Sequence, residues 1–570
     1  MTPHAFAVFG LVALAACAPQ TGGPEEPSIS TARFERFVYS GSDPVHEDIQ
    51  RGPDTYLNPV LGGFYPDPSN TRAGNDYFLV TSTFAYFPGL PVFRSSDLVN
   101  WEQIGNAVDR PDQVDFGQLG LSRGLFAPAI EFHDGIFYIF NTCVDCGGNF
   151  VITARDPAGP WSDPSWLPEL VGGIDPALFV DDDGRAYVVN NGPPDRTPEY
   201  DGHRAVWVQE FDLETLTTFG PRTVLIDGGV DFSEQPVWIE GPHIYKVDGR
   251  YILTAAEGGT AENHSQVVLA SDAPMGPYTP HDANPILTQR DLPRDRANPI
   301  TSAGHADLVQ TPDGDWWATF LAVRPYGDDQ YNTGRETFLM PVRWVDGWPR
   351  ITDAGEAIPF VATSPDLPGQ AAPARPMGGA FTRIDEFDGT AMDPEWMMMR
   401  NPRETWWALE GGELRLRPRA AGLGDNANPS FFGRRQQHMN ARGELTLQFQ
   451  PDTIGARAGL AVLQNDDFWF FIGLELTDEG PALRLRQRAG SGQDRQGVVL
   501  ATLLLDTMPR NPLSLRVTAR GAFYDFDYRL PNDDWQTLLH DADGSQLSTR
   551  NAGGFVGVTM GPHAYSPNGG

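Results

Sequence analysis

The sequence predicts an all-β protein with two domains, a five-bladed β-propeller followed by a β-sandwich. Before residue 363, a pattern of one strand, a tight turn and a second, aromatic-rich strand recurs five times. A stretch rich in Pro, Ala and Gly follows at residues 363–380, and beyond it apolar and polar residues alternate in many short segments. With 570 residues, 40% of them hydrophobic, the chain is long enough to bury more than one core.

The five repeats begin near residues 67, 126, 175, 240 and 305. A spacing of roughly 50 to 65 residues fits a four-stranded propeller blade better than any helical repeat. In four repeats an Asp-Gly pair, which a tight hairpin favours, separates the first two strands. These pairs are Asp134-Gly135, Asp183-Gly184, Asp248-Gly249 and Asp313-Gly314, and Gly74-Asn75 takes their place in the first repeat.

Three repeats begin with an acidic residue, Asp67, Asp175 or Glu240, and the fifth begins with His305. The first strand of each propeller blade lines the central channel, so residues at equivalent places that open these strands face one another. We therefore predict that these four side chains converge. An Asp-Pro pair that merely starts a turn explains one acid easily, but it explains three in register poorly.

The Pro-rich stretch at residues 363–380 has the composition of an extended interdomain linker. We therefore expect the propeller at residues 51–362 and the second domain at residues 381–570. Segments such as 413–417, 444–450 and 482–486 alternate with period two, which indicates strands with one buried face and hence a β-sandwich. No catalytic group of residues stands out in this domain.

The N-terminus predicts export. The apolar run at residues 5–16 is shorter than the roughly 20 residues that span a bilayer, but it suits a signal segment. The segment 1–17 ends in Leu14-Ala15-Ala16-Cys17, which resembles a bacterial lipoprotein signal and implies lipidation of Cys17; an ordinary secretory signal is the alternative. Residues 18–50 are then expected to form a tether. The predicted location is the periplasm or cell surface, with a lipid anchor as the contact with a membrane.

The formal net charge of -34 limits the partners. Such an excess of acid repels polyanions and disfavours nucleic acid or an anionic membrane surface, whereas a neutral substrate is compatible with it. The oligomeric state stays open.

Cys143 and Cys146 form a C-x-x-C pair. Two thiols make an incomplete zinc site, and no βαβ pattern supports a thioredoxin-like role. In an oxidising compartment we expect a local disulfide, with two free thiols as the alternative.

Six motifs together resemble family 43 of the glycoside hydrolases, the inverting β-xylosidases and α-L-arabinofuranosidases. They lie at residues 58–69, 83–89, 173–176, 239–243, 304–308 and 334–338. The region after residues 387–389 is similar to the jelly-roll, concanavalin-like sandwich that follows the propeller in many xylosidases of that family. The resemblance implies that Asp67 is the general base, that Glu240 is the general acid, and that Asp175 modulates and orients the acid. Phe126 departs from the family pattern, in which many relatives carry Trp.

Inverting hydrolysis explains why three carboxyl groups are needed. A base activates water on one face of the sugar and an acid protonates the leaving oxygen on the other, about 6.5 to 9.5 Å away. Asp67 must be ionised and Glu240 protonated, so their environments must separate the two pKa values. An ionised Asp175 near Glu240 would raise the pKa of the acid by like-charge repulsion.

Five further residues are predicted to bind substrate. Arg335 is the candidate cation that balances the acidic pocket, with an ion pair to Glu336 as the structural alternative. His305 could bind water, a structural calcium ion at the propeller centre, or nothing exchangeable. Phe84, Phe87 and Phe126 are candidates for stacking on a sugar ring, although core packing explains Phe84 equally well. No cofactor is required for the reaction.

These features predict an exo-acting glycosidase that releases xylose or arabinofuranose from the non-reducing ends of oligosaccharides derived from xylan or arabinoxylan. One alternative is a retaining, β-fructosidase-like propeller hydrolase, in which the two carboxyl groups lie about 5 Å apart. A second alternative is a surface lipoprotein that binds glycans without cleaving them. The sequence leaves open the choice between xylosidase, arabinofuranosidase and both.

Overall fold

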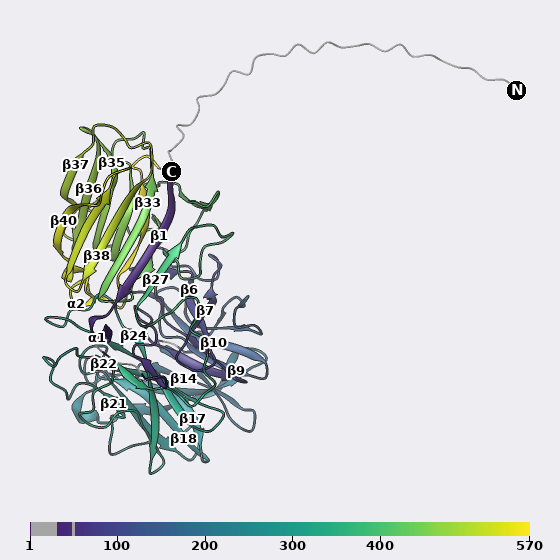
Figure 1. Ribbon diagram of the computed structural model, residues 1–570. Coiled ribbons are helices and arrows are strands. Elements are labelled where there is room, and N and C mark those ends of the chain that lie inside the picture. The colour runs from purple at the N-terminus through teal and green to yellow at the C-terminus, as the bar shows by residue number, and fades with distance from the viewer. Residues whose placement is uncertain (2–30, 48, 50–51, 171, 570) are drawn as a thin grey trace.

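The computed structural model describes residues 1, 31–47, 49, 52–170 and 172–569 (Figure 1). Cys17, the rest of the predicted signal beyond Met1, and residues 18–30 of the predicted tether lie outside these ranges. Within them the chain is nearly all β, and the α-helices are the short α1 (Pro44–Glu47) and α2 (Thr549–Ala552). No helix in the described ranges has the length and apolar character needed to cross a bilayer.

Five antiparallel sheets form the five blades of a propeller, which confirms the predicted fold class. Blade 1 contains β3 (Ser69–Ala73), β4 (Asp76–Val80), β6 (Gly89–Ser95) and β7 (Glu102–Val108). Blade 2 contains β8 (Gly124–Leu125), β9 (Ala129–His133), β10 (Ile136–Val144), β11 (Gly148–Ala154) and β12 (Ser165–Trp166). Blade 3 contains β13 (Ile174–Val180), β14 (Ala186–Gly192), β15 (Ala205–Asp212) and β16 (Thr217–Asp227). Blade 4 contains β17 (Glu240–Val247), β18 (Arg250–Glu257), β19 (Ser265–Ser271), β20 (Thr279–Pro280) and β21 (Leu287–Thr288), and the 3-10 turn η1 (Phe232–Glu234) precedes it. Blade 5 contains β22 (Thr301–Gln310), β23 (Trp316–Val323), β24 (Glu336–Val345) and β25 (Trp348–Arg350).

The inner strands β3, β9, β13, β17 and β22 contact one another in sequence, and β22 returns to β3, so the ring closes. Outside the blades, β2 (Thr55–Leu57) pairs with β26 (Val361–Thr363) and joins the two ends of the propeller segment. The Asp-Gly turns adopt the left-handed backbone that tight hairpins need. Asp134 and Gly135, for example, have φ values of 47° and 78°.

The inner strands show that Glu240 is not equivalent to the other two acids, in contrast to the prediction. Asp67, Asp175 and His305 have φ near 54°, but in blade 4 this conformation belongs to Gly241, at φ 55°. The strand registers agree, because the pairing shifts directly after Ile174 in blade 3 and directly after Glu240 in blade 4. Glu240 therefore stands one residue earlier in the repeat.

Packing across the channel explains this offset. A Cβ atom on Gly241 would lie 2.8 Å from the imidazole ring of His305. A side chain at that place in blade 4 would have to displace the His305 ring, whereas the preceding residue, Glu240, lines the cavity without this contact.

The second domain is a sandwich of two antiparallel sheets. The first sheet runs β29 (Trp407–Leu409), β30 (Leu414–Leu416), β1 (Ala32–Ser42), β33 (Asn440–Gln448), β38 (Leu513–Arg520), β39 (Phe523–Arg529) and β40 (Gln536–Asp543), with β27 (Phe381–Asp385) beside β1. The second runs β31 (Ser430–Phe431), β41 (Thr559–Tyr565), β34 (Arg457–Asn465), β35 (Phe468–Thr477), β36 (Gly480–Ala489) and β37 (Val498–Leu504), with β32 (Arg434–Arg435) beside β41. The 3-10 turn η2 (Gly544–Leu547) and α2 connect the sheets.

The prediction that residues 18–50 form a tether is wrong for residues 32–42, because these residues form β1, a central strand of the sandwich (Figure 1). Phe34, Phe37 and Tyr39 point into the core and are at most 2% exposed. A bulge between Phe34 and Arg36 interrupts the alternation of apolar residues, which obscures the strand pattern in the sequence. The partner β33 lies some 400 residues away in sequence.

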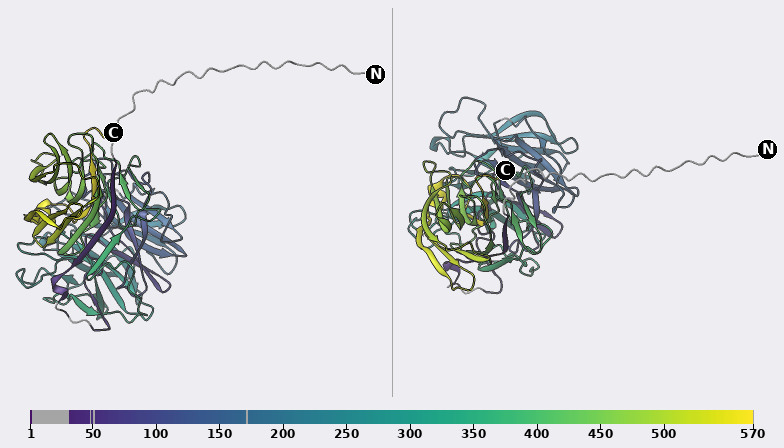
Figure 2. Two further views of the ribbon diagram at one scale, coloured as in Figure 1. Left: turned by 45° about the horizontal axis from the view of Figure 1, so that its top comes forward. Right: turned by 90° about the horizontal axis from the view of Figure 1, so that it is seen from above.

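The two domains share a continuous apolar core, and Figure 2 shows the sandwich packed against one side of the propeller. Strand β5 (Tyr86–Phe87) of the propeller pairs with β28 (Met398–Met399) of the second domain. The segment predicted as a linker connects β26 to β27. The shared core and the pairing of β5 with β28 fix the sandwich loops relative to the channel.

Candidate active site

A cavity of about 390 Å³ lies where the inner strands begin. It brings together the three acids and most of the predicted substrate-binding residues. The predicted residues that line it are Asp67, Asp175, Glu240, Arg335, His305, Phe84 and Phe126. All five blades contribute to the lining, because the fold places the start of every inner strand around the channel.

Asp67 is a buried carboxylate surrounded by donors. Ser82 Oγ donates a hydrogen bond to its Oδ2 at 2.6 Å. Arg335 donates from Nη1 to Oδ1 at 3.1 Å and from Nη2 to Oδ2 at 3.5 Å. A hydroxyl and a guanidinium stabilise the ionised carboxylate, which is the form that a general base requires.

Arg335 pairs with Asp67 and not with Glu336, the alternative partner that the sequence suggested. The Glu336 carboxylate instead accepts two hydrogen bonds from Arg324, at 2.6 and 2.8 Å. Arg324 also pairs with Asp43 at 2.7 Å. The neighbouring Arg335 therefore keeps its charge directed at the cavity.

Glu240 has a different environment. Its carboxyl group is buried and makes no hydrogen bond or ion pair within the described ranges. Burial, and secondly the charge of Asp67, raise the pKa of Glu240 to about 7, although Arg335 and Arg204 act in the opposite direction. A carboxyl group with this pKa holds a proton near neutral pH, as a general acid must.

Asp175 titrates together with Glu240. Burial raises the pKa of Asp175 well above its usual value, and the charges of Glu240 and Asp67 add to this effect. Its Oδ2 accepts a hydrogen bond from the backbone N–H of Gly241 at 3.0 Å, which ties Asp175 to the residue after the acid. The two carboxyl groups hold their protons more tightly than isolated groups do.

His305 lies at the cavity wall against Gly241. Burial is the main reason that its pKa falls to about 4, so the imidazole is neutral at pH 7 and its nitrogen can act as a ligand. Among the described residues, however, His305 belongs to no group of three or more adjacent His, Cys, Asp or Glu ligands. The side chains alone do not form a calcium site here, and the ion at the propeller centre stays a prediction.

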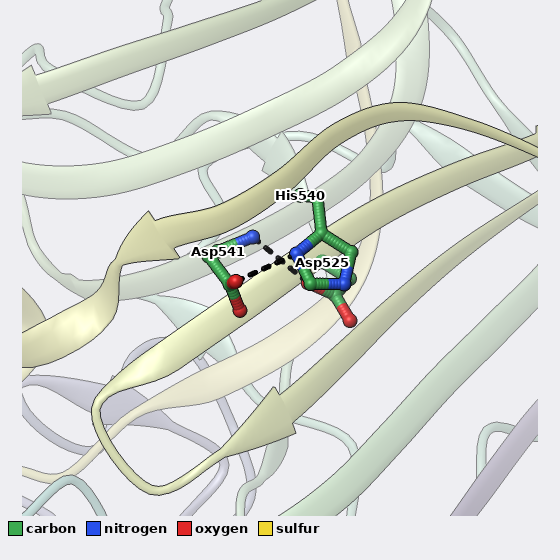
Figure 3. Close-up of side chains that lie close together, drawn as sticks. All are labelled: Asp525, His540 and Asp541. Carbon is green, nitrogen blue, oxygen red and sulfur yellow. Dashed lines mark hydrogen bonds and ion pairs between the residues drawn. The ribbon is translucent and has the colours of Figure 1, made fainter.

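Among the described residues, three possible metal ligands do lie together on the sandwich: Asp525, His540 and Asp541 (Figure 3). Arg520 Nη2 pairs with both carboxylates at 2.8 Å. The cluster is therefore an ion-pair network on the surface of β39 and β40, in which an arginine already neutralises the acids.

Three phenylalanines form one wall of the cavity. The Phe84 ring stacks on Phe555 at a centroid distance of 5.7 Å, and Phe126 meets both rings edge to face. The Arg335 guanidinium lies over the Phe555 ring at 5.2 Å and over the Phe84 ring at 5.9 Å. This wall therefore belongs to the Asp67 side of the cavity.

The prediction that Phe87 stacks on a sugar is wrong. The residue is 4% exposed, lies in the shared apolar core and pairs with Met398 across the domain boundary. Two residues of the same motif thus have different roles, because Phe84 faces the channel while Phe87 faces the sandwich.

Sequence reasoning missed Phe555 and Trp238, which also line the cavity. Phe555 belongs to the sandwich and follows Gly553 and Gly554, two glycines with φ near 75°. Its backbone N–H donates to Ser122 Oγ of the propeller at 2.8 Å. The Gly-Gly pair signals a turn in the sequence, but only the docked domains show that this turn reaches the cavity.

Cys143 and Cys146 form the predicted disulfide in blade 2. Neither cysteine lines the cavity, which leaves the bond a local structural element of the turn after β10.

Comparison with known proteins agrees with this geometry. Residues 56–349 match the model of glycosyl hydrolases family 43, and residues 384–570 match the β-xylosidase C-terminal concanavalin A-like domain. A xylosidase/arabinosidase of Butyrivibrio fibrisolvens is 37% identical over 89% of this chain and 95% of its own length. The non-reducing end α-L-arabinofuranosidase BoGH43B of Bacteroides ovatus is 35% identical over 90% and 91% of the two chains.

A crystal structure of a GH43_12 protein retrieved from the capybara gut metagenome superimposes with a TM-score of 0.88. It shares 36% identity, and the match covers 94% of this chain and 100% of the other. The family model, the relatives and the cavity with its three carboxyl groups agree, and the chain belongs to family 43 of the glycosyl hydrolases and is a glycosidase.

Proposed function

We propose that the protein is an exported, exo-acting glycosidase that removes xylose or arabinofuranose from the non-reducing ends of xylan-derived oligosaccharides with inversion. The contrast between Asp67 and Glu240 carries this proposal. One carboxyl group is held by a cation and a hydroxyl, and the other is buried without a donor and has a pKa of about 7. An ionised base and a protonated acid are the two groups that inverting hydrolysis needs.

In the proposed mechanism Asp67 accepts a proton from water as the water oxygen attacks the anomeric carbon. Glu240 donates its proton to the glycosidic oxygen as the bond from that oxygen to the anomeric carbon breaks. Asp175 orients the backbone beside the acid through its hydrogen bond from the Gly241 N–H, and its carboxyl group can also accept a hydrogen bond from a sugar hydroxyl. Solvent exchange then returns the proton from Asp67 and restores the proton of Glu240.

The shape of the cavity supports exo action. Blade residues surround it, and Phe555 from the sandwich covers one side. A pocket that is walled around and open at its mouth accepts the end of a chain, whereas internal cleavage needs a groove that is open at both ends. The relatives named as xylosidases and arabinofuranosidases support a pentose as the terminal sugar.

An NMR time course tests the stereochemistry. With nitrophenyl β-xylopyranoside and nitrophenyl α-L-arabinofuranoside as parallel substrates, we expect the first sugar product to have the inverted anomeric configuration. A first product with retained configuration would favour the β-fructosidase-like alternative, and binding without turnover would favour the glycan-binding alternative. The ratio of the two rates determines the preferred pentose.

We also propose export with a lipid anchor at Cys17, on the basis of the motif at residues 14–17. Replacing Cys17 with Ala should move the protein from the membrane fraction to the soluble fraction of the producing cell. An unchanged distribution would argue for an ordinary secretory signal or none.

The calcium ion at the propeller centre is a further proposal, based on the place of His305 at the cavity wall. We expect EDTA to lower the thermal stability of the protein and calcium to restore it. Identical melting curves with and without EDTA would remove the proposal.

A further inference from the structure

Trp238 lines the cavity on the side of the proposed acid. It precedes Glu240 by two residues and is half-buried, and the adjacent Val237, which also lines the cavity, is 44% exposed. Apolar surface left exposed at the mouth of a cavity commonly marks a place where a ligand binds.

The backbone and a cation hold the indole ring in place. Trp238 has a φ of 49°, an unusual conformation for this residue, and its backbone N–H donates to the carbonyl of Gly202 at 2.9 Å. The guanidinium of Arg204 lies over the ring, with Cζ 4.6 Å from the centroid. One face of the indole is thus covered by a fixed charge.

Arg204 is itself held by hydrogen bonds. Its Nε and Nη2 donate to Asn191 Oδ1 at 3.0 and 2.8 Å, and Nη2 also donates to the Gly172 carbonyl at 2.5 Å. Asn191 Nδ2 in turn donates to the carbonyl of Ile239 at 2.5 Å. The support of the indole ring and the backbone next to Glu240 therefore belong to one network, which couples the position of the ring to that of the acid.

The location relative to the two carboxyl groups indicates which part of a substrate would meet the ring. The acid has to touch the glycosidic oxygen, so the departing sugar lies on the Glu240 side of the cavity. The three phenylalanines lie instead with Arg335 and Asp67. We propose that Trp238 is the platform on which the departing sugar of an oligosaccharide substrate stacks, and that it sets the preference for sugar leaving groups.

Trp207, in blade 3, is a tryptophan that also stacks on an arginine but lies away from the cavity. The Arg222 guanidinium lies 4.5 Å from the centroid of Trp207, a geometry close to that of Arg204 and Trp238. Trp207 does not line the cavity, and its Nε1 donates to the Pro193 carbonyl at 2.9 Å. Trp207 is therefore a matched control for the loss of a stacked tryptophan.

The proposal rests on the glycosidase function proposed above, and a pair of substrates separates the two. The pentosyl fluoride has a leaving group too small to reach Trp238, whereas the disaccharide xylobiose, or its arabinofuranosyl-xylose counterpart, has a sugar leaving group. For Trp238→Leu we expect the kcat/KM for the disaccharide to fall about tenfold further than that for the fluoride, since aromatic stacking and the lost apolar contact are together worth about 1 to 2 kcal/mol. Trp238→Phe, which keeps a flat ring, should recover part of the difference.

The control Trp207→Leu should leave the ratio of the two kcat/KM values at the parent level. An equal fall for both substrates in Trp238→Leu would overturn the platform, because a merely structural role affects both alike. An equal change of the ratio in Trp207→Leu would also overturn it. If the parent protein hydrolyses neither substrate, the proposed function fails, and the platform fails with it.

Discussion

Asp67 and Glu240 line one cavity from blades 1 and 4, and their surroundings differ in nearly every respect. Arg335 and Ser82 donate to the carboxylate of Asp67. Glu240 has no such donor in the described part of the chain, and burial together with the charge of Asp67 raises its pKa to about 7. Residue type does not distinguish a base from an acid here, since both are carboxyl groups. The neighbouring residues distinguish them, so removing a neighbour or one of the two carboxyl groups tests the difference.

The largest effect is expected from the two carboxyl groups themselves. Asp67→Ala should lower kcat by about 10²- to 10⁴-fold on every substrate, because water then lacks a base. Glu240→Gln should cause a comparable loss on xylobiose but a much smaller one on the pentosyl fluoride, whose leaving group needs little protonation. Steady-state kinetics on both substrates, with circular dichroism to establish folding, measure the difference. Near-parent rates for Asp67→Ala, or equal losses on both substrates for Glu240→Gln, would contradict the assigned roles.

Arg335 should have the next largest effect. Arg335→Met leaves the Asp67 carboxylate buried without its cation. Breaking a buried ion pair in this way lowers the free energy of unfolding by about 3 to 5 kcal/mol. We expect a fall in kcat/KM of about 10²-fold or more. Because Arg335 lowers the pKa of Glu240, its removal should also move the alkaline limb of the pH profile to higher pH.

Arg335→Lys is the matched variant, since it keeps the charge and loses the paired hydrogen bonds. Its alkaline limb should stay close to that of the parent. A limb that shifts equally in both variants would show that the charge of Arg335 does not act on the acid.

Asp175 tests how the acid keeps its proton. The alkaline limb of kcat/KM should lie near pH 7 in the parent, because Glu240 loses activity when it loses its proton. Because burial and the neighbouring acids raise the pKa of Asp175 itself, Asp175→Asn should leave the limb in place, and a limb that moves to lower pH would show that Asp175 is charged beside the acid. If the limb does not move while activity falls, Asp175 acts as a substrate ligand alone.

The last effect is on stability rather than on rate. The pKa of Glu240 is raised from 4.5 to about 7 by folding, so the group favours the folded state fully at pH below about 4.5, and this contribution is lost as pH rises through about 7. Between pH 4 and pH 8 the parent should lose up to about 3 kcal/mol of stability relative to Glu240→Gln. Thermal unfolding of both proteins at the two pH values measures it. A stability difference that does not change with pH would show that folding does not raise the pKa of Glu240.

The sequence predicted those parts of the molecule that depend on local chemistry. Asp-Gly turns and repeated strand starts were sufficient for the five blades, because each hairpin is encoded within a few residues. Strand β1 was missed, since a bulge disturbs its alternation and its partners lie far along the chain. Asp67, Asp175 and Arg335 were found in motifs beside the channel.

Other parts of the site depend on how distant segments pack. Phe555 reaches the cavity only because the sandwich docks on Ser122, and Trp238 reaches it through a left-handed backbone turn. The offset of Glu240 follows from the contact between Gly241 and His305, two residues on different blades. None of these contacts leaves a periodic signal in the sequence.

Strand β1 also affects how the protein can fold during synthesis. It emerges from the ribosome before the propeller, yet its neighbours β30 and β33 follow the propeller in sequence. The propeller is therefore an insertion within the sandwich, and the sandwich cannot complete its first sheet until residue 543 has been made. A chain truncated after residue 380 would keep Phe34, Phe37 and Tyr39 without a sheet to cover them. Such a fragment would be prone to aggregation, so the catalytic propeller is best produced together with the domain that follows it.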